Sequence, residues 1–356
     1  IRDSLSADDI LAYFQTGFGI YEGERTETTT VRFTPDDRSD GIRWDNKLNW
    51  NTGDRPMEGD SVDLASNWVN YSGTHEINDL FIGDNGRLDV ESGRLDVTGE
   101  LHGGANAQID VDEAGQLWIE NYSDQDELDI DVDGGRFANT GFFEGLLDLH
   151  VTDGQALLGF DDAVMELSNG SVVTVDGDDA KVGFDGEDGG VSVLRMETGS
   201  ELRMIADGSG FTTIEEFRSG VHDSDTPDVL SAFDMGEGTL LVDVGAIAGG
   251  GARSEVLVDT DQVVGMFDDV EFIGLGNKQD ATLTVDYETD KLTVTLGAAG
   301  QGTGKINVAT VGNMLNAADD VEIWDALTEG QGTYEEADPT PTVNGTELDE
   351  NDILAA

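Results

Sequence analysis

The 356-residue sequence has no cysteine and few basic residues, with 18 Lys and Arg against 76 Asp and Glu, which gives a formal net charge of -58. The lack of cysteine excludes disulfide bonds and thiolate metal sites. A polyanion of this size is repelled by nucleic acids and by anionic membrane surfaces, so we expect no nucleic-acid partner. No apolar run approaches the roughly 20 residues of a membrane-spanning helix, and we expect no membrane insertion.

Proline is also scarce, with 5 residues, whereas glycine is abundant, with 47. Glycine-rich turns between alternating runs of Val, Leu, Ile and Asp are typical of short β-strands joined by tight turns. The chain begins at Ile1 without a basic-then-apolar leader, and we expect it to be a processed or excised piece of an extracellular protein.

An internal repeat is the most informative feature of the sequence. An acidic residue, a glycine and an apolar strand recur together in the middle of the chain. The repeating acids follow one another at intervals of about 21 residues and are Glu91, Asp112, Asp133, Asp153, Asp176 and Glu197. A period of about 20 residues without a helix fits one turn of a parallel β-helix. A set of antiparallel hairpins with similar turns is the alternative.

These patterns predict an all-β fold: a right-handed parallel β-helix (solenoid) with a C-terminal β-rich cap and short terminal helices. The helices are expected at 4–16 and 308–327, where apolar residues follow helical spacing. Five segments are expected: a helix and strand segment at 1–40, a Trp-rich cap of the solenoid at 41–76, β-helix repeats at 77–206, an irregular segment with C-terminal strands at 207–297, and a Gly-rich link, helical tail and extended C-terminus at 298–356.

Two segments carry a resemblance to a known class of proteins. Residues 44–62 read Trp-Asp-Asn-Lys-Leu-Asn-Trp-Asn-Thr-Gly-Asp-Arg-Pro-Met-Glu-Gly-Asp-Ser-Val. This segment resembles the module that opens large secreted β-helical proteins of bacteria, such as adhesins and autotransporter-like passenger domains. Residues 255–296, with a Gly-Met-Phe turn and a final Thr-Val-Thr-Leu strand, are similar to the end of such passengers. The resemblance implies a β-helical architecture and an extracellular or bacterial cell-surface location, although the extreme acidity and the terminal helices depart from the pattern.

The sequence shows no recognisable catalytic motif. The histidines His75, His102, His150 and His222 lack metal-ligand spacing. A Gly-x-Ser-x-Gly nucleophile turn and phosphate-binding loops do not occur. We therefore predict that the chain is not an enzyme, with a carbohydrate-active β-helix enzyme, a polysaccharide lyase or hydrolase, as the alternative.

Calcium is the cofactor that the acidic turns indicate, because Ca²⁺ binds carboxylate and carbonyl oxygens. The segment Asp129-x-Asp131-x-Asp133-Gly resembles the start of a calcium loop, although Thr140 stands where that loop has Glu. Stacked acids of the repeat would repel each other, and a bound cation would relieve the repulsion. The candidate ligands are Asp112, Asp129, Asp131, Asp133, Asp153, Asp176 and Asp178. The alternative is that these carboxylates point outward from a solvated strand.

The remaining features favour a structural role. Trp44, Trp50 and Trp68 are predicted to plug the first coil, with a sugar-stacking platform as the alternative. The predicted function is a structural or adhesive scaffold of a bacterial surface or matrix, stabilised by calcium. We expect it to be a homo-oligomer or self-assembling polymer, as a filament, layer or coat. A carbohydrate-active enzyme or a calcium-dependent carbohydrate-binding module, with an extracellular polysaccharide as partner, is the alternative.

Overall fold

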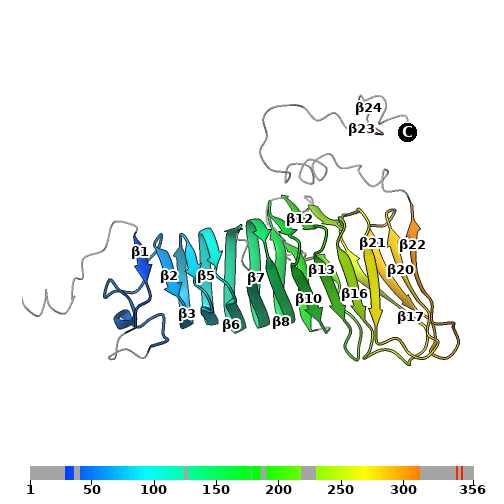
Figure 1. Ribbon diagram of the computed structural model, residues 1–356, viewed down its shortest axis with the longest axis horizontal. Helices are drawn as coiled ribbons and strands as arrows, with labels where there is room; N and C mark the ends of the chain where they lie inside the picture. Colours follow the sequence, from blue (N-terminus) through cyan, green and yellow to red (C-terminus); the bar gives the residue numbers. More distant parts are fainter. Residues whose placement is uncertain are drawn as a thin grey trace, which may run out of the picture.

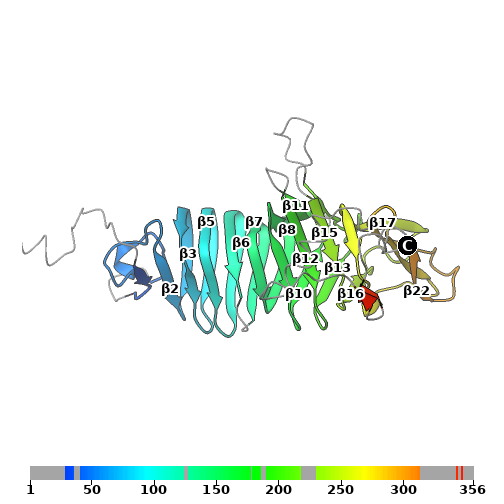
Figure 2. The same ribbon diagram turned by 90° about the horizontal axis from the view of Figure 1, so that it is seen from above.

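The computed structural model describes residues 29–35, 41–123, 127–177, 179–185, 190–217 and 230–312, together with the backbone of two short strands, β23 (Thr342–Val343) and β24 (Thr346–Glu347). The described part is all-β and consists mainly of a large, mostly parallel sheet that does not close. In Figures 1 and 2 the strands stack one after another along the long axis of the molecule, from β1 to β22.

Five long strands form the middle of the molecule and take part in more than one ladder of parallel pairs. They are β3 (Trp68–Ile77), β5 (Arg87–Gly103), β6 (Ala107–Tyr122), β7 (Leu128–Gly145) and β8 (Leu147–Phe160). Each changes its pairing register at a bend between its halves, so the chain passes from one ladder into the next.

Three ladders of parallel pairs run along the described part of the molecule. The first ladder joins the first halves of the long strands and continues in β10 (Val172–Asp176), β13 (Glu201–Ile205), β16 (Thr239–Asp243) and β19 (Asp269–Ile273). The second ladder joins their second halves and continues in β11 (Ala180–Asp185), β14 (Ile214–Glu216) and β17 (Arg253–Asp259). The third ladder contains β1 (Thr30–Arg32), β2 (Ser61–Ala65), β4 (Leu80–Ile82), the ends of β5 to β7, β9 (Val164–Leu167), β12 (Val191–Met196), β15 (Leu230–Asp234) and β18 (Gln262–Val264).

Alternation of apolar and polar residues explains why each strand has a buried and an outward face. In the first ladder one buried column is continuous over seven strands: Leu88, Ile109, Ile130, Leu149, Val173, Leu202 and Leu240 are aligned by pairing and at most 1% exposed. The column belongs to one core cluster that extends from Val31 to Leu296. One pass of the chain through the three ladders is called a rung. Each rung thus buries its aliphatic side chains only against the rungs beside it.

The repeat step is regular in the middle of the molecule and longer afterwards. Arg87 pairs with Gln108 and Gln108 with Asp129, a step of about 21 residues. The step becomes longer beyond β8, since Val172 pairs with Glu201. The ladders extend beyond residues 77–206 in both directions.

The longer step corrects the last interval of the sequence repeat. Asp176 pairs with Ile205, whereas Met196, just before Glu197, pairs with Leu167 of the third ladder. Glu197 therefore does not stack on Asp176, and the interval between these two acids is not a repeat step.

Trp44 and Trp50 close the β1 end of the core, as predicted for a plug. Trp44 is fully buried and Trp50 is 3% exposed, and the Trp50 indole Nε1–H donates to the Trp44 carbonyl oxygen at 2.8 Å. The two rings meet edge to face, and the Trp50 ring meets that of Phe33 in the same way. The short helix η1 (Lys47–Asn49) lies between the two tryptophans. Trp68 is different, because it is 52% exposed on the flank.

At the opposite end the pairing turns antiparallel. Strand β17 pairs with β21 (Lys291–Leu296), and β21 forms an antiparallel hairpin with β20 (Ala281–Asp286). Strand β22 (Ile306–Val311) then pairs with β20 in parallel.

One prediction for the C-terminal segment needs correction. The helix expected from Val308 is wrong for residues 308–311, which belong to β22 because the β-branched residues of this segment favour an extended strand. The Gly-rich link is held in turns by Asp280, whose Oδ1 accepts from the backbone N–H groups of Thr303 and Lys305 at 2.7 and 2.8 Å. The helix expected at 4–16 and the rest of the C-terminal helix lie outside the described residues.

Candidate functional site: two lateral ladders of polar side chains

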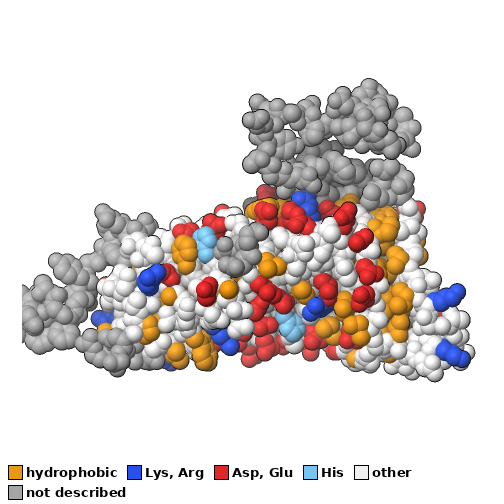
Figure 3. All heavy atoms as spheres, viewed as in Figure 1, with side chains coloured by type: hydrophobic (Ala, Val, Ile, Leu, Met, Phe, Trp, Pro, Cys, Tyr) orange, Lys and Arg blue, Asp and Glu red, His pale blue; other side chains and the backbone are white. Residues whose placement is uncertain are grey.

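A row of aspartate side chains, the acidic ladder, lies on the outward face of the strands that form the first ladder. Pairing aligns Asp89, Asp110 and Asp131 on three successive strands, roughly 4.8 Å apart. Arg87 lies among them, with its Nε 2.6 Å from Asp89 Oδ1 and 2.7 Å from Asp110 Oδ2. The next rung places His150 beside Asp131, with Nδ1 and Oδ1 3.5 Å apart. Figure 3 shows carboxylates outnumbering Lys and Arg on one face of the molecule.

A second acidic group adjoins this ladder on β7 and β8. Asp129 pairs with Asp148, and the side chain of Glu127 approaches both. One carboxylate oxygen from each residue lies within 4.8 Å of the other two. Asp129 and Asp148 are half-buried, and Glu127 is exposed. Three converging carboxylates form an all-oxygen donor set, which suits a hard cation such as Ca²⁺, with water completing the coordination.

The electrostatics of the acidic ladder favour uptake of positive charge. Burial, together with Asp89 and Asp131, raises the pKa of Asp110 to about 6, against the opposing effect of Arg87. Burial and the neighbouring carboxylates of Asp129 and Glu127 also raise the pKa of Asp148. Each shift means that one more negative charge is unfavourable there, and a proton or a metal ion relieves the repulsion.

The candidate ligands from the sequence fall into three groups in the structure. Asp129 and Asp131 lie on the outward face of β7, within the acidic ladder and its adjoining group. Asp112, Asp133 and Asp153 are aligned by pairing but exposed at a corner, away from the Glu127 group. Asp176 is half-buried on β10, with Oδ2 3.9 Å from His150 Nε2. Asp178 lies outside the described residues.

Glu127 and Asp148, which converge on Asp129, and Asp89 and Asp110 of the acidic ladder are not among the candidate ligands expected from the sequence. Asp110 precedes Asp131 by one full repeat step, so the repeat itself could have found it. Asp148 follows Asp129 by less than the repeat step, and this shorter interval hides the alignment.

A row of hydrogen-bond donors from Arg, Gln and Lys side chains, the donor ladder, lies on the outward face of the strands that form the second ladder. Pairing aligns Arg94, Gln116, Arg136, Gln155 and Lys181 on five successive strands, with no carboxylate in the row.

The two arginines of the donor ladder stack on one tryptophan. The guanidinium carbons of Arg94 and Arg136 lie 4.0 and 4.8 Å from the ring centroid of Trp118. Their acidic partners lie to the side: Arg94 pairs with Asp96, and Arg136 lies 3.7 Å from Asp185. Burial lowers the pKa of Arg136. Arg94 and Arg136 thus line one face of the molecule and also pair with acids.

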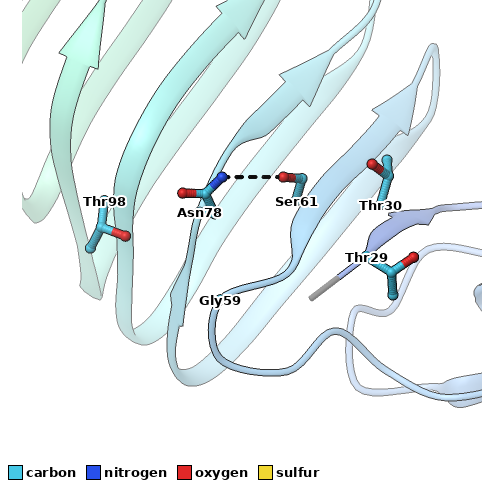
Figure 4. Close-up of a pocket in the computed structure, with 6 residues that line it drawn as sticks. All are labelled: Thr29, Thr30, Gly59, Ser61, Asn78 and Thr98. Atoms are coloured by element: carbon cyan, nitrogen blue, oxygen red, sulfur yellow. Dashed lines mark hydrogen bonds between the residues drawn. The ribbon is translucent and has the colours of Figure 1, made fainter. Parts of the chain in front are cut away.

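A shallow hollow lies near the β1 end of the third ladder (Figure 4). It has a volume of about 410 Å³ and is lined by Thr29, Thr30, Gly59, Ser61, Asn78 and Thr98. Asn78 Nδ2 donates to Ser61 Oγ at 3.4 Å. The six lining residues provide hydroxyl and amide groups but no carboxylate, imidazole or amine, so the hollow lacks an acid–base pair.

Among the described residues, no helix is long and apolar enough to cross a membrane. Comparison of the chain with protein-family models, with curated proteins and with solved structures gave no significant match.

Proposed function

We propose that the chain is an extracellular structural and adhesive scaffold of a bacterial surface or matrix. In this proposal it is a right-handed parallel β-helix that self-associates into a filament, layer or coat. The observation that carries the proposal is the set of three parallel ladders, which repeat the same order of strands rung after rung. A chain that visits three ladders in a fixed order winds as a solenoid. Connections between parallel strands are almost always right-handed, which supports the hand.

The proposal includes stabilisation by calcium at Glu127, Asp129 and Asp148. Their oxygens lie within 4.8 Å of one another, which is about the largest separation that two oxygens bound to one Ca²⁺ at 2.3–2.6 Å can have. The ion would neutralise carboxylates whose mutual repulsion the fold otherwise tolerates. Because the ligands belong to β7 and β8 and to the residue before β7, binding would hold two adjacent rungs together.

Thermal unfolding with calcium and with a chelator tests the calcium site. We expect calcium to raise the melting temperature, since a ligand that binds only the folded state stabilises it. Asp148→Asn should remove most of that increase, whereas Asp153→Asn, at the exposed corner, should retain it. Equal melting temperatures in calcium and in chelator contradict a structural calcium ion.

Electron microscopy of the assembled protein tests the scaffold, which requires ordered contacts between copies. Dispersed single molecules under all conditions argue against the scaffold.

A carbohydrate-binding function is the second candidate, and the donor ladder favours it. A row of Arg, Gln, Arg, Gln and Lys suits the carboxylates and hydroxyls of an extended acidic polysaccharide. In affinity electrophoresis, retardation by a polyuronate that is lost in Arg136→Gln would support this function. Arg203→Gln, a change on the face of the first ladder, is the control.

A further inference from the structure

Strand β22 presents an open edge at the C-terminal end of the described sheet. Within the described residues it pairs with β20 alone, and all six of its residues are exposed. The carbonyl oxygens of Lys305 and Val311 accept from β20 and Tyr287 N–H groups, both at 2.9 Å. Because backbone groups alternate sides along a strand, those of Ile306, Val308 and Thr310 point to the open edge. An edge of this kind is a template for another strand.

The open edge is also free of negative charge. Residues 291–318 form the longest stretch of the sequence without Asp or Glu, although the chain has 76 such residues. By contrast β19, which pairs only with β16 among the described strands, carries Asp269 and Glu271. Charged side chains on an edge strand prevent pairing with another chain. Two copies of this negatively charged chain can therefore approach each other closely at β22 but not at β19.

The other end of the sheet is closed to such pairing. The outer side of β1 is bonded to the segment that contains Trp50, since Asn51 N–H donates to the Arg32 carbonyl at 2.9 Å and Thr34 N–H donates to the Asn49 carbonyl. Head-to-tail pairing of β22 with β1 of a second copy would require this segment to leave. Among the described strands, β18 also lacks charged residues and pairs only with β15, but its residues are buried. The remaining described partner with an exposed and uncharged open edge is β22 of another copy.

We propose that β22 pairs in antiparallel fashion with β22 of a second copy about a two-fold axis, so that the sheet continues through a dimer. This inference rests on the proposed self-association and assigns a surface to it. The backbone N–H and C=O groups on the open edge fix the register between the two copies of β22. A two-fold axis at Val308 places the two Val308 residues opposite each other and Ile306 opposite Thr310. The β-branched side chains then meet across the interface, as paired strands favour. The contact is isologous, so it closes as a dimer and leaves the flanks for further assembly.

Sedimentation equilibrium of the wild-type chain and two variants tests the proposal. Val308→Pro removes a backbone N–H on the open side of β22. The odd-numbered residues of β22 make the hydrogen bonds to β20, so the fold should remain. Val308→Thr keeps the N–H and the branched shape and is the matched control. We expect the wild type and Val308→Thr to have twice the chain mass of 38.0 kDa, and Val308→Pro to have the single mass with an unchanged circular dichroism spectrum.

Two results would overturn the edge pairing. One is a Val308→Pro chain that still dimerises. The other is a wild-type chain that stays monomeric in the micromolar range; slow hydrogen exchange of the Ile306, Val308 and Thr310 amides in that monomer would show that the chain's own residues cover the edge. Ordered assemblies that persist in micrographs of Val308→Pro would retain the scaffold and remove only this surface.

Discussion

At the residue scale, Glu216 shows how this fold tolerates its excess of carboxylates. Its Oε1 accepts from Ser231 Oγ at 2.5 Å, and Asp261 Oδ2 accepts from the Ser231 backbone N–H at 3.1 Å. Burial, together with the hydrogen bond to Asp261, raises the pKa of Glu216 to about 8. We therefore expect the pair to share a proton, which would replace the repulsion of two carboxylates by a hydrogen bond.

This pair makes stability depend on pH in an unusual direction. The folded-state pKa of Glu216 lies above its ordinary value of 4.5, so the folded state binds the extra proton, and stability falls as pH rises from about 4.5 to about 8. Glu216→Gln should raise the free energy of unfolding at the upper end of this range by roughly 1 kcal/mol, after allowance for solvent screening. It should leave the lower end unchanged, as measured by denaturant unfolding in chelator. Glu215→Gln, at the exposed neighbour, is the control, and parallel pH curves for the wild type and Glu216→Gln would refute the shared proton.

Individual acids also show the limit of prediction from the sequence. The stacking of Asp112, Asp133 and Asp153 follows from their spacing, and the structure confirms it. The group of Glu127, Asp129 and Asp148 does not follow from spacing, because the step from β7 to β8 is shorter than the repeat. A shift of two residues leaves the same face of a strand outward but changes which acids become neighbours.

At the element scale, Gly183 of β11 is one of the positions where pairing leaves no room for a side chain. A Cβ at this position would lie 1.7 Å from the Glu215 carbonyl oxygen on β14, which is closer than atoms approach. Only glycine allows the two strands to pair here.

Gly183→Ala should therefore destabilise the protein by roughly 1–3 kcal/mol or more, because β11 and β14 must separate. Gly208→Ala is the matched control, since a Cβ there meets no atom within 4 Å, and we expect almost no change. Denaturant unfolding of both variants measures the difference. Equal stability of the two variants would mean that β11 and β14 do not pair as described.

The elements themselves were predictable where alternation is strong and a turn is explicit. The hairpin of β20 and β21 is predictable, because Asp286 to Lys291 separates two runs of strictly alternating residues. Strand β22 was mistaken for the start of a helix, because its few apolar residues also fit helical spacing. What decides its state is pairing with β20, and a single sequence does not contain that information.

At the scale of the whole molecule, the regular step of about 21 residues makes one rung a removable unit. If residues 108–128 are deleted, Asp129 follows Ala107 and takes the place of Gln108 opposite Arg87. The inward columns stay in phase, since Ile130 then replaces Ile109. In the proposed solenoid, contacts between neighbouring rungs supply the stability, so the loss of one rung should preserve the rest.

We expect the chain without residues 108–128 to fold and to be shorter by about 4.8 Å, as measured by small-angle X-ray scattering. Deletion of residues 108–117 removes about half a rung, puts the remaining strands out of phase and should abolish cooperative unfolding. If the two deletions behave alike, the rungs are not equivalent units, and the solenoid proposal fails with them.

The direction of the ladders has a mechanical consequence. Hydrogen bonds between paired strands point along the stacking direction, so a force that pulls the two ends of the molecule apart loads one rung at a time and not all rungs together. Each rung that opens releases about 21 residues, which extend by up to roughly 70 Å. The molecule would therefore yield in small, repeated steps under tension and lengthen many-fold before the chain is fully drawn out.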